Sequence, residues 1–443
     1  MHNDKTTLKD LSIFGADGED VFSLINFTVT QAGRDMLVKH IQHPPDKLVQ
    51  LQEMQETVRY LAANPGYGTT QISNGTIVML EKFFESAEDT IAPPSGITLL
   101  LGSFFQKALN KNQYFITRFS LSHLSDFLSG CSELTTILDQ GNLPTLLRKE
   151  LEAMQSELQH PLTDDIIKIT NDTPYSGLSR LSYDARRQMK NITYRLITHY
   201  SRLDAWQSMA KATLQLNWVF PKLEAASPVV FEATALYHPL LQNPVSYNIN
   251  FNNNRNFLVL TGANMSGKTT FLRTLGVSAL LAHLGMGVPA RSLRISFLHG
   301  VITNMHVEDS LMRGESYFFA EVQRMKLTAQ KLLESEPHLV LMDELFKGTN
   351  VHDAYECTRA VVDGLLHRPN HLMILSTHLY EVAQHFKDRQ EIMFAYFVTR
   401  MLENDTFFFT YELKQGISHD RIGYRILQKE GVLDLLMNPK GAG

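Results

Sequence analysis

The segment at residues 262–269, GANMSGKT, constrains the fold of this chain more than any other feature. It matches the GxxxxGK[ST] pattern in full, and that pattern has a physical role only between a strand and a helix. An apolar run at 257–260 precedes it, and a helical pattern at 271–284 follows it. We therefore expect a phosphate-binding loop (Walker A) in an α/β domain. The alternative is an accidental glycine-rich turn before a core helix.

The chemistry expected of this loop is the binding of phosphate and Mg²⁺. Backbone N–H groups around the glycines would wrap phosphate oxygens, and the N-terminus of the following helix would add a positive dipole. Lys268 is expected to reach the β- and γ-phosphates, and the Thr269 hydroxyl is expected to coordinate Mg²⁺. The candidate nucleotide-binding residues are Gly262, Ala263, Asn264, Met265, Ser266, Gly267, Lys268, Thr269 and Thr270.

A second apolar run, at 339–342, ends in two acidic residues, Asp343 and Glu344. Together with the Walker A loop, this run has the pattern of a Walker B strand. Asp343 would hold the Mg²⁺ shell, and Glu344 would orient and deprotonate the attacking water. A second acid beside the Mg²⁺ aspartate favours hydrolysis over transfer to a bulky acceptor. The alternative is a strand end followed by a solvated acidic turn.

Two further residues are candidates for the same site. The apolar run 373–375 leads to His378, and ligands of such sheets bind at the carboxyl ends of the strands. His378 would sense the γ-phosphate or the attacking water. Ser316 opens a helical pattern, where a hydroxyl and free backbone N–H groups can bind a phosphate. The alternatives are a hydrogen-bonded core or surface histidine and a simple helix cap.

The chain reads as a helical half followed by an α/β half. Helical spacing of apolar residues dominates up to about residue 228, including one long pattern from about 183 to 216. From 229 onward, short β-rich runs alternate with helical patterns, which is typical of an α/β domain. We expect an all-α domain over 1–228 and a P-loop ATPase domain over 229–443. The runs 393–398 and 406–413 predict an edge hairpin.

Composition excludes several classes of protein. With 44% hydrophobic and 20% charged residues, the chain is not collagen-like, a disulfide scaffold or wholly disordered. A net charge of -5 excludes a strongly basic nucleic-acid coat, although local basic patches stay open. Cys131 and Cys357 exclude a zinc site built on cysteines. No secretory signal and no apolar run of about 18–20 residues occur, so we expect a cytoplasmic protein without a membrane span.

The motifs resemble those of the MutS mismatch-repair family. TGANMSGKTT at 261–270 is similar to the family's TGPNMGGKST, and MDEL at 342–345 with Gly348-Thr349 is similar to MDEIGRGT. Ser376-Thr377-His378 matches its ATH switch, and GESYF at 314–318 resembles its GxSTF signature. Likenesses at 8–14 and 28–34 extend into the helical half.

The resemblance implies an ABC-type ATPase that binds ATP and Mg²⁺ and forms a homodimer. Ser316 would reach the γ-phosphate of the nucleotide held by the partner subunit, and Asn264 would brace the phosphate loop. Tyr411 aligns with an adenine-stacking position, and residues 416–436 look like a shortened dimer contact. Residues 1–228 would be the family's lever domain with its DNA clamp absent or vestigial. No segment resembles the family's mismatch-reading domain.

Two functions of different classes stay open from the sequence. One is a MutS-type ATPase that moves its levers on DNA, in mismatch repair or DNA-structure processing. Its candidate phosphate contacts are Arg186, Arg187 and Lys190, which could equally be a solvated helix surface. The other is an ATP-switched scaffold that acts on a protein partner, such as a repair protein, without recognising DNA. Glu344 and the Ser316 segment argue against a third possibility, a small-molecule kinase.

Overall fold

The computed structural model of the chain divides into two compact units. It describes residues 4–15, 19–85, 111–139, 141–170, 172–252, 254–263, 265–305, 317–334, 336–401, 407–418, 431–432 and 436. The α/β unit comprises Met1–Leu24, Ile41–Gln52 and Gln215–Gly443. The helical unit comprises Ile25–His40 and Glu53–Leu214. The domains expected at 1–228 and 229–443 stay a prediction, and the first residues of the chain fall in the α/β unit.

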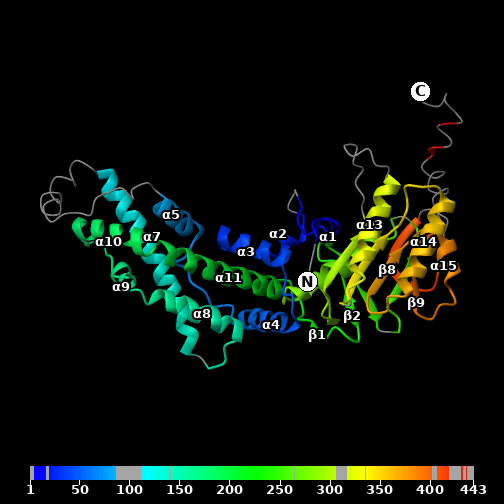
Figure 1. The fold of residues 1–443 in the computed structure, drawn as a ribbon, viewed down its shortest axis with the longest axis horizontal. Helices are drawn as coiled ribbons and strands as arrows, with labels where there is room; N and C mark the ends of the chain where they lie inside the picture. Colours follow the sequence, from blue (N-terminus) through cyan, green and yellow to red (C-terminus); the bar gives the residue numbers. More distant parts are fainter. Residues whose placement is uncertain are drawn as a thin grey trace. The chain divides into compact units, whose positions relative to one another are not determined.

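In the helical unit, several helices pack around α7 (Figure 1). The helix α7 contacts α5, α8, α9 and α10. The helices that lie wholly or largely in this unit are α3 (Gln31–Gln42), α4 (Leu48–Ala63), α5 (Asn74–Glu85), α7 (Lys111–Thr135), the 3-10 helix η2 (Thr136–Asp139), α8 (Thr145–Leu158), α9 (Pro161–Ile167), α10 (Tyr175–Gln188) and α11 (Lys190–Gln215).

The long helical pattern expected from about 183 to 216 corresponds to two helices. The helix α10 ends at Gln188, Met189 is its C-cap, and α11 begins at Lys190. Met189 is fully buried. The apolar spacing therefore continues through the junction, and for this reason the periodicity did not reveal the break.

The start of α3 is fixed by a buried carboxylate of α11. Asp204 accepts hydrogen bonds from the N–H groups of Val29 and Thr30, both at 2.9 Å, and from the Thr30 hydroxyl at 2.7 Å. Burial raises the pKa of Asp204, and these hydrogen bonds oppose that effect. A Cβ at Gly33 would lie 2.1 Å from Asp204 Oδ2, so this contact requires glycine.

The α/β unit contains a six-stranded sheet in the order β10-β9-β4-β8-β7-β6. All neighbouring pairs are parallel except β9 and β10, which form an antiparallel hairpin at one edge. The strands β4, β7 and β8 are buried along their whole length, as continuous apolar runs require. The strands are β4 (Phe257–Thr261), β6 (Gly300–Asn304), β7 (His338–Asp343), β8 (Leu372–Ser376), β9 (Ile392–Met401) and β10 (Phe407–Gln415).

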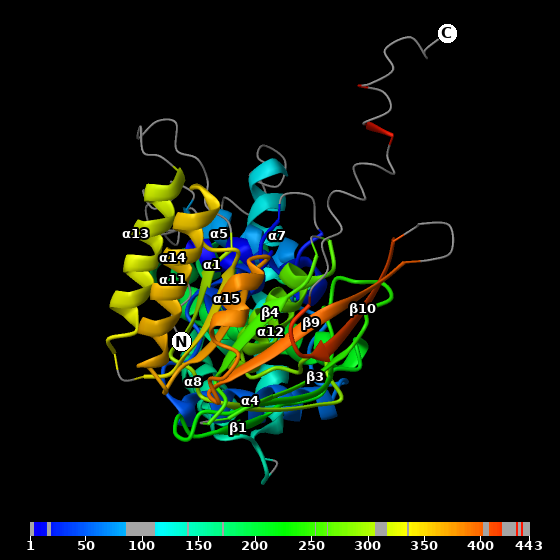
Figure 2. The same ribbon diagram turned by 90° about the vertical axis from the view of Figure 1, so that its right-hand side faces the viewer.

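Helices cover both faces of this sheet. On one face, α13 (Tyr317–Lys331), α14 (Val351–Leu366) and α15 (Tyr380–His385) share one apolar core with the strands (Figure 2). The helix α12 (Lys268–His283) contacts β6, β7 and β8, and α1 (Lys5–Asp10) contacts β6. The short helix α2 (Val21–Ile25) follows α1 in the chain.

A second sheet of the α/β unit has four strands in the order β1-β5-β2-β3. The pair β1 and β5 is parallel and the other pairs are antiparallel. Its strands are β1 (Lys222–Glu224), β2 (Phe231–Leu236), β3 (Tyr247–Phe251) and β5 (Ser292–Ser296). The expected mixture of helices and sheet is confirmed, as two mixed sheets with helices. Among the described residues, no helix is long and apolar enough to cross a membrane.

Candidate nucleotide site

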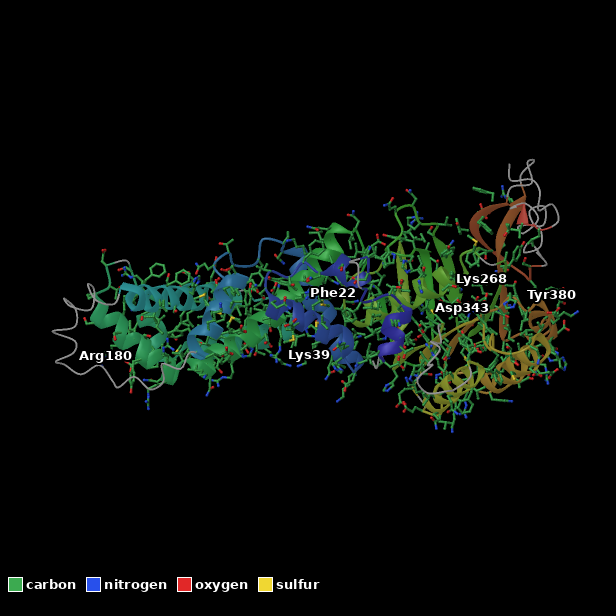
Figure 3. The ribbon with its side chains drawn as sticks, turned by 90° about the horizontal axis from the view of Figure 1, so that it is seen from above. Phe22, Lys39, Arg180, Lys268, Asp343 and Tyr380 are labelled. Atoms are coloured by element: carbon green, nitrogen blue, oxygen red, sulfur yellow. The ribbon has the colours of Figure 1, made fainter. Side chains whose placement is uncertain are left out.

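The expected site residues lie at the carboxyl ends of neighbouring strands of the six-stranded sheet. The strands β4, β8 and β7 are adjacent and parallel, so their carboxyl ends lie together. The Walker A loop follows β4, Asp343 ends β7, and His378 follows β8 by two residues. Lys268 and Asp343 lie beside one another in Figure 3. Parallel strands only about 4.8 Å apart thus bring three separate motifs into one place.

The Walker A loop has the backbone that its glycines allow. Gly262 and Gly267 have φ values of +142° and +106°, in the region that favours glycine. Lys268 opens α12, and its Nζ donates to the carbonyls of Gly262 and Ala263, both at 2.9 Å. Burial lowers the pKa of Lys268, and the nearby Glu344 acts against this. Asn264 lies outside the described residues.

The predicted Mg²⁺ ligands are already paired. The Thr269 hydroxyl donates to Asp343 Oδ2 at 2.6 Å. Within the described part of the chain, the other buried oxygen, Asp343 Oδ1, has no hydrogen-bond partner, and neither does the buried Ser266 hydroxyl. Buried polar atoms nearly always have a partner, so these two atoms fit a bound cation and phosphate. A hydroxyl and a carboxylate are the oxygen ligands that Mg²⁺ prefers.

The Glu344 carboxylate lies among three nitrogen-bearing side chains. Lys347 Nζ is 2.8 Å from Oε2, and Lys268 Nζ and His378 Nδ1 are each 3.8 Å from Oε1. His378 foremost, then Lys347 and Lys268, lower the pKa of Glu344 to about 2 despite its burial. The backbone N–H of Glu344 donates to the carbonyl of Ser376 at 2.8 Å, which joins the ends of β7 and β8. Glu344 is therefore ionised and held in place at neutral pH.

Two residues of this site were not anticipated from the sequence. One is Lys347, three residues after Glu344. The other is Glu321 of α13, which accepts hydrogen bonds from the N–H groups of Lys347 at 3.2 Å and Gly348 at 3.1 Å. A Cβ at Gly348 would lie 2.6 Å from Tyr317 Cδ1, so the loop after Glu344 packs closely against the start of α13. The only indication of Lys347 in the sequence is its position three residues after Glu344. This position brings the two side chains together only because the chain turns after Glu344.

Ser316 directly precedes α13 but lies outside the described residues, as do residues 306–315. Its expected role stays a prediction. The helix that it precedes does contribute to the site, because Tyr317 and Glu321 line a small cavity together with Asp343 and Glu344.

Tyr411 projects toward the Walker A loop from an irregular point of β10. The register with β9 shifts between Phe409 and Leu413, and Tyr411 has a φ of +54°. Such bulges re-aim a side chain out of the regular alternation. A Cβ at Gly267 would lie 3.2 Å from Tyr411 Cδ1, so the ring lies against this glycine. Its 44% exposure leaves ring surface for a ligand. Of the expected dimer contact at 416–436, residues 419–430 and 433–435 lie outside the described part.

The three basic residues expected on the lever differ in their surroundings. Arg186 Nη1 donates to the carbonyl of Phe83 at 2.6 Å, and its guanidinium lies 4.1 Å from the centre of the Phe83 ring. Arg187 is exposed and lies over the Tyr183 ring, whereas Lys190 is half-buried at the start of α11. Arg186 thus has a packing role, and Arg187 and Lys190 are the better candidates for a phosphate contact.

Comparisons with known proteins match the part of the chain that holds this site. Residues 258–438 match the family model of MutS domain V. The chain is 28% identical over 258 residues to the DNA mismatch repair protein MutS of Thermotoga sp., an alignment that covers 57% of this chain and 31% of that relative. It is 30% identical over 236 residues to the DNA mismatch repair protein msh3 of Aspergillus fumigatus, covering 51% and 21%. The chain therefore spans less than a third of these relatives, and its similarity to the MutS family extends over about half of its own length.

Proposed function

We propose that this protein binds ATP with Mg²⁺ and hydrolyses the γ-phosphate. The observation that carries the proposal is the pairing of Thr269 with Asp343, whose second buried oxygen has no hydrogen-bond partner among the described residues. Similarity to the MutS family supports it, because domain V is the region that bears the family's ATPase. The direct test is Mg²⁺-dependent phosphate release from ATP by the purified chain, which Lys268→Ala should abolish by weakening nucleotide binding.

Each residue of the site has one task in this mechanism. Thr269 and Asp343 would hold Mg²⁺, which supplies charge neutralisation at the β- and γ-phosphates. Lys268 would exchange its contacts with the Gly262 and Ala263 carbonyls for phosphate oxygens. Glu344 would accept a hydrogen bond from the attacking water and aim it at phosphorus. His378, at the end of β8, would contact the same water or the γ-phosphate.

The move of Lys268 would also change the basicity of Glu344. In the described geometry Lys268 is one of the groups that hold the pKa of Glu344 at about 2, and a carboxylate of such low pKa is a weak base. When Lys268 turns to phosphate, Glu344 would lose one positive neighbour, while His378 and Lys347, which lower its pKa more, would remain. The move would therefore raise the basicity of Glu344 only in part.

We further infer a role in DNA mismatch repair or DNA-structure processing. Both relatives named above are DNA mismatch repair proteins, and the helical unit would act as the lever that ATP moves. Ser316 would complete the nucleotide site of a second copy, so the active form would be a homodimer. The alternative is a scaffold that acts on a protein partner and does not recognise DNA. One observation favours it: Arg186, one of the three expected contacts to DNA phosphates, is held by Phe83 instead.

Tyr411→Ala should weaken ATP binding about tenfold and leave the turnover number at saturating ATP unchanged. Stacking of a base on an aromatic ring contributes roughly 1–3 kcal/mol, and about 1.4 kcal/mol corresponds to tenfold in affinity. Tyr411→Phe keeps the ring and is the matched control. Titration with a fluorescent ATP analogue would measure both variants. Equal affinities for Tyr411→Ala and the wild type would remove Tyr411 from the adenine site.

This chain should bind DNA through phosphates, without a tenfold preference for a single mismatch over matched duplex. Mismatch reading needs base contacts or an inserted wedge, and we expect neither from this sequence, in which no segment resembles the family's mismatch-reading domain. Affinity should fall steeply with salt. Arg187→Glu with Lys190→Glu should weaken binding about tenfold at low salt, because each phosphate contact contributes to this electrostatic attraction.

The matched control for that DNA experiment is Lys39→Glu with Lys149→Glu. Both lysines are exposed in the helical unit, and the change of net charge is the same. Titrations with homoduplex, one-mismatch and four-way-junction DNA would separate the outcomes. If both pairs of substitutions weakened DNA binding equally, net charge would control binding, and not the Arg187 and Lys190 side chains in particular. A clear mismatch preference would show that a recognition element exists in this chain.

A further inference from the structure

Three potential metal ligands meet at the edge of the six-stranded sheet opposite the nucleotide site. His299 directly precedes β6, His338 is the first residue of β7, and Glu334 lies between α13 and β7. The ligand atoms of these three residues all lie within 4.8 Å of one another. His299 Nε2 is 3.7 Å from Glu334 Oε2. In the described part of the chain, no other group of three histidine, cysteine or acidic side chains is so close.

The two histidines are positioned by the backbone of the sheet. The strands β6 and β7 are parallel, with Gly300 in register with His338. The N–H of His299 donates to the carbonyl of Pro337 at 2.7 Å, which extends this pairing to the residue before β6. The two imidazole rings have their centres 5.4 Å apart. A pair of ligands on adjacent strands is held more firmly than a pair on loops.

The tautomer of His338 is fixed in the form that can bind a metal. His338 Nδ1 lies 2.9 Å from the carbonyl oxygen of Glu336, which can only accept, so Nδ1 carries the hydrogen. Nε2 then presents its lone pair. Histidines that bind metals commonly donate their other ring N–H in this way, to a carbonyl or a carboxylate. His371 supports the same residue from behind, since its Nδ1 accepts the His338 backbone N–H at 3.2 Å.

We propose that His299 Nε2, Glu334 and His338 Nε2 form a Zn²⁺ site. Two imidazoles and one carboxylate, with a water as fourth ligand, are a known ligand set for Zn²⁺, whereas Mg²⁺ prefers oxygen ligands. The site is thus distinct from the one at Thr269 and Asp343, in chemistry and in position.

A bound ion would give the α/β unit a structural clamp. Glu334 comes three residues after the end of α13, His299 directly precedes β6, and His338 is the first residue of β7. The ion would therefore fix the C-terminal end of α13 to the sheet. The other end of α13 carries Tyr317 and Glu321, which line the nucleotide site. The clamp would hold this helix in register with the site and take no part in the chemistry.

The test is calorimetric titration of the chelator-treated full chain with Zn²⁺, with excess Mg²⁺ present to occupy the oxygen site. We expect one equivalent of Zn²⁺ to bind. His299→Asn combined with Glu334→Gln should lower the affinity at least ~100-fold, since even outer residues of metal sites contribute 10–100-fold. Glu336→Gln, exposed in the same loop and outside the ligand set, is the matched control and should bind like the wild type.

A second readout separates binding from misfolding. Zn²⁺ should raise the melting temperature of the wild type and of Glu336→Gln, because a ligand that binds only the folded state stabilises it. It should leave that of the double variant unchanged. The double variant keeps the buried His338, and its circular dichroism spectrum without metal should match the wild type. Equal Zn²⁺ affinity in the double variant and the wild type, or no stoichiometric binding by the wild type, would overturn the proposal.

Discussion

Glu344→Gln should reduce ATP turnover at least ~10²-fold while ATP binding stays at least as tight as in the wild type. Glutamine has the size of glutamate and can still accept a hydrogen bond from Lys347. It cannot take a proton from water, and its neutral amide attracts the water less strongly. Binding should be retained because removing this negative charge frees Lys268, 3.8 Å away, for phosphate.

Two measurements on the same preparation would check this expectation. Phosphate release reports turnover, and a fluorescent ATP analogue reports binding. Lys268→Ala is the opposite control, because it should lose binding itself. Glu336→Gln removes a carboxylate of the same unit far from the site and should behave like the wild type. Turnover at the wild-type rate by Glu344→Gln would exclude Glu344 as the residue that acts on water.

The motifs of the nucleotide site could be predicted because their chemistry is local. A strand, a glycine loop and a helix follow one another in the sequence, and so Lys268 and Thr269 could be placed before any contact was known. Asp343 could be paired with them only through the rule that parallel strands end at one edge. The distances between Glu344 and its neighbours could not be predicted from the sequence. They depend on a tight turn with φ of +52° at Glu344 and +61° at Phe346.

One strand that the sequence left unassigned, β6, carries polar side chains in the core. The strand β6 contains Thr303 and Asn304, which are buried. The Thr303 hydroxyl donates to Asp10 at 2.7 Å, and the Asn304 amide donates to the Thr328 hydroxyl at 3.0 Å. Their partners lie in α1 and α13, far away in the chain, so no pattern of apolar residues marks this strand. The apolar pattern of β5 is interrupted in a different way, by the partly exposed Arg294, which is paired with Glu232 of β2 at 2.6 Å.

Residues that reach a site only through tertiary contacts were equally hard to predict from the sequence. Tyr411 was expected near adenine only through the family resemblance, and its approach to Gly267 depends on the bulge in β10. His299 and His338 have no spacing that suggests a metal, because 38 intervening residues separate them and only the β6–β7 pairing joins them. Tertiary pairing, and not local propensity, determines each of these contacts.

Mixing Lys268→Ala chains with Ser316→Ala chains should restore ATP hydrolysis that neither variant has alone. If Ser316 acts on the nucleotide of the partner, a mixed dimer has one intact site. That site combines the Walker A loop of the Ser316→Ala chain with Ser316 of the Lys268→Ala chain. Symmetric pairing is the usual arrangement of soluble homo-oligomers, and random exchange of subunits would then give about a quarter of the wild-type activity. Each variant alone should have lost at least ~10²-fold.

The contrast between two mixtures makes this test decisive. Mixing Lys268→Ala with Glu344→Gln chains places both defects on the same Walker A and B side of the site, so every mixed dimer lacks an intact site. Rescue should therefore occur with Ser316→Ala and fail with Glu344→Gln. Within one subunit, Tyr317 at the start of α13 packs on the loop that follows Glu344, so this helix begins beside the nucleotide site. No rescue in either mixture, with dimers present by light scattering, would mean that Ser316 acts within its own subunit or not at all. Restored hydrolysis in both mixtures would mean that one subunit stabilises the fold of the other and does not supply a missing catalytic group.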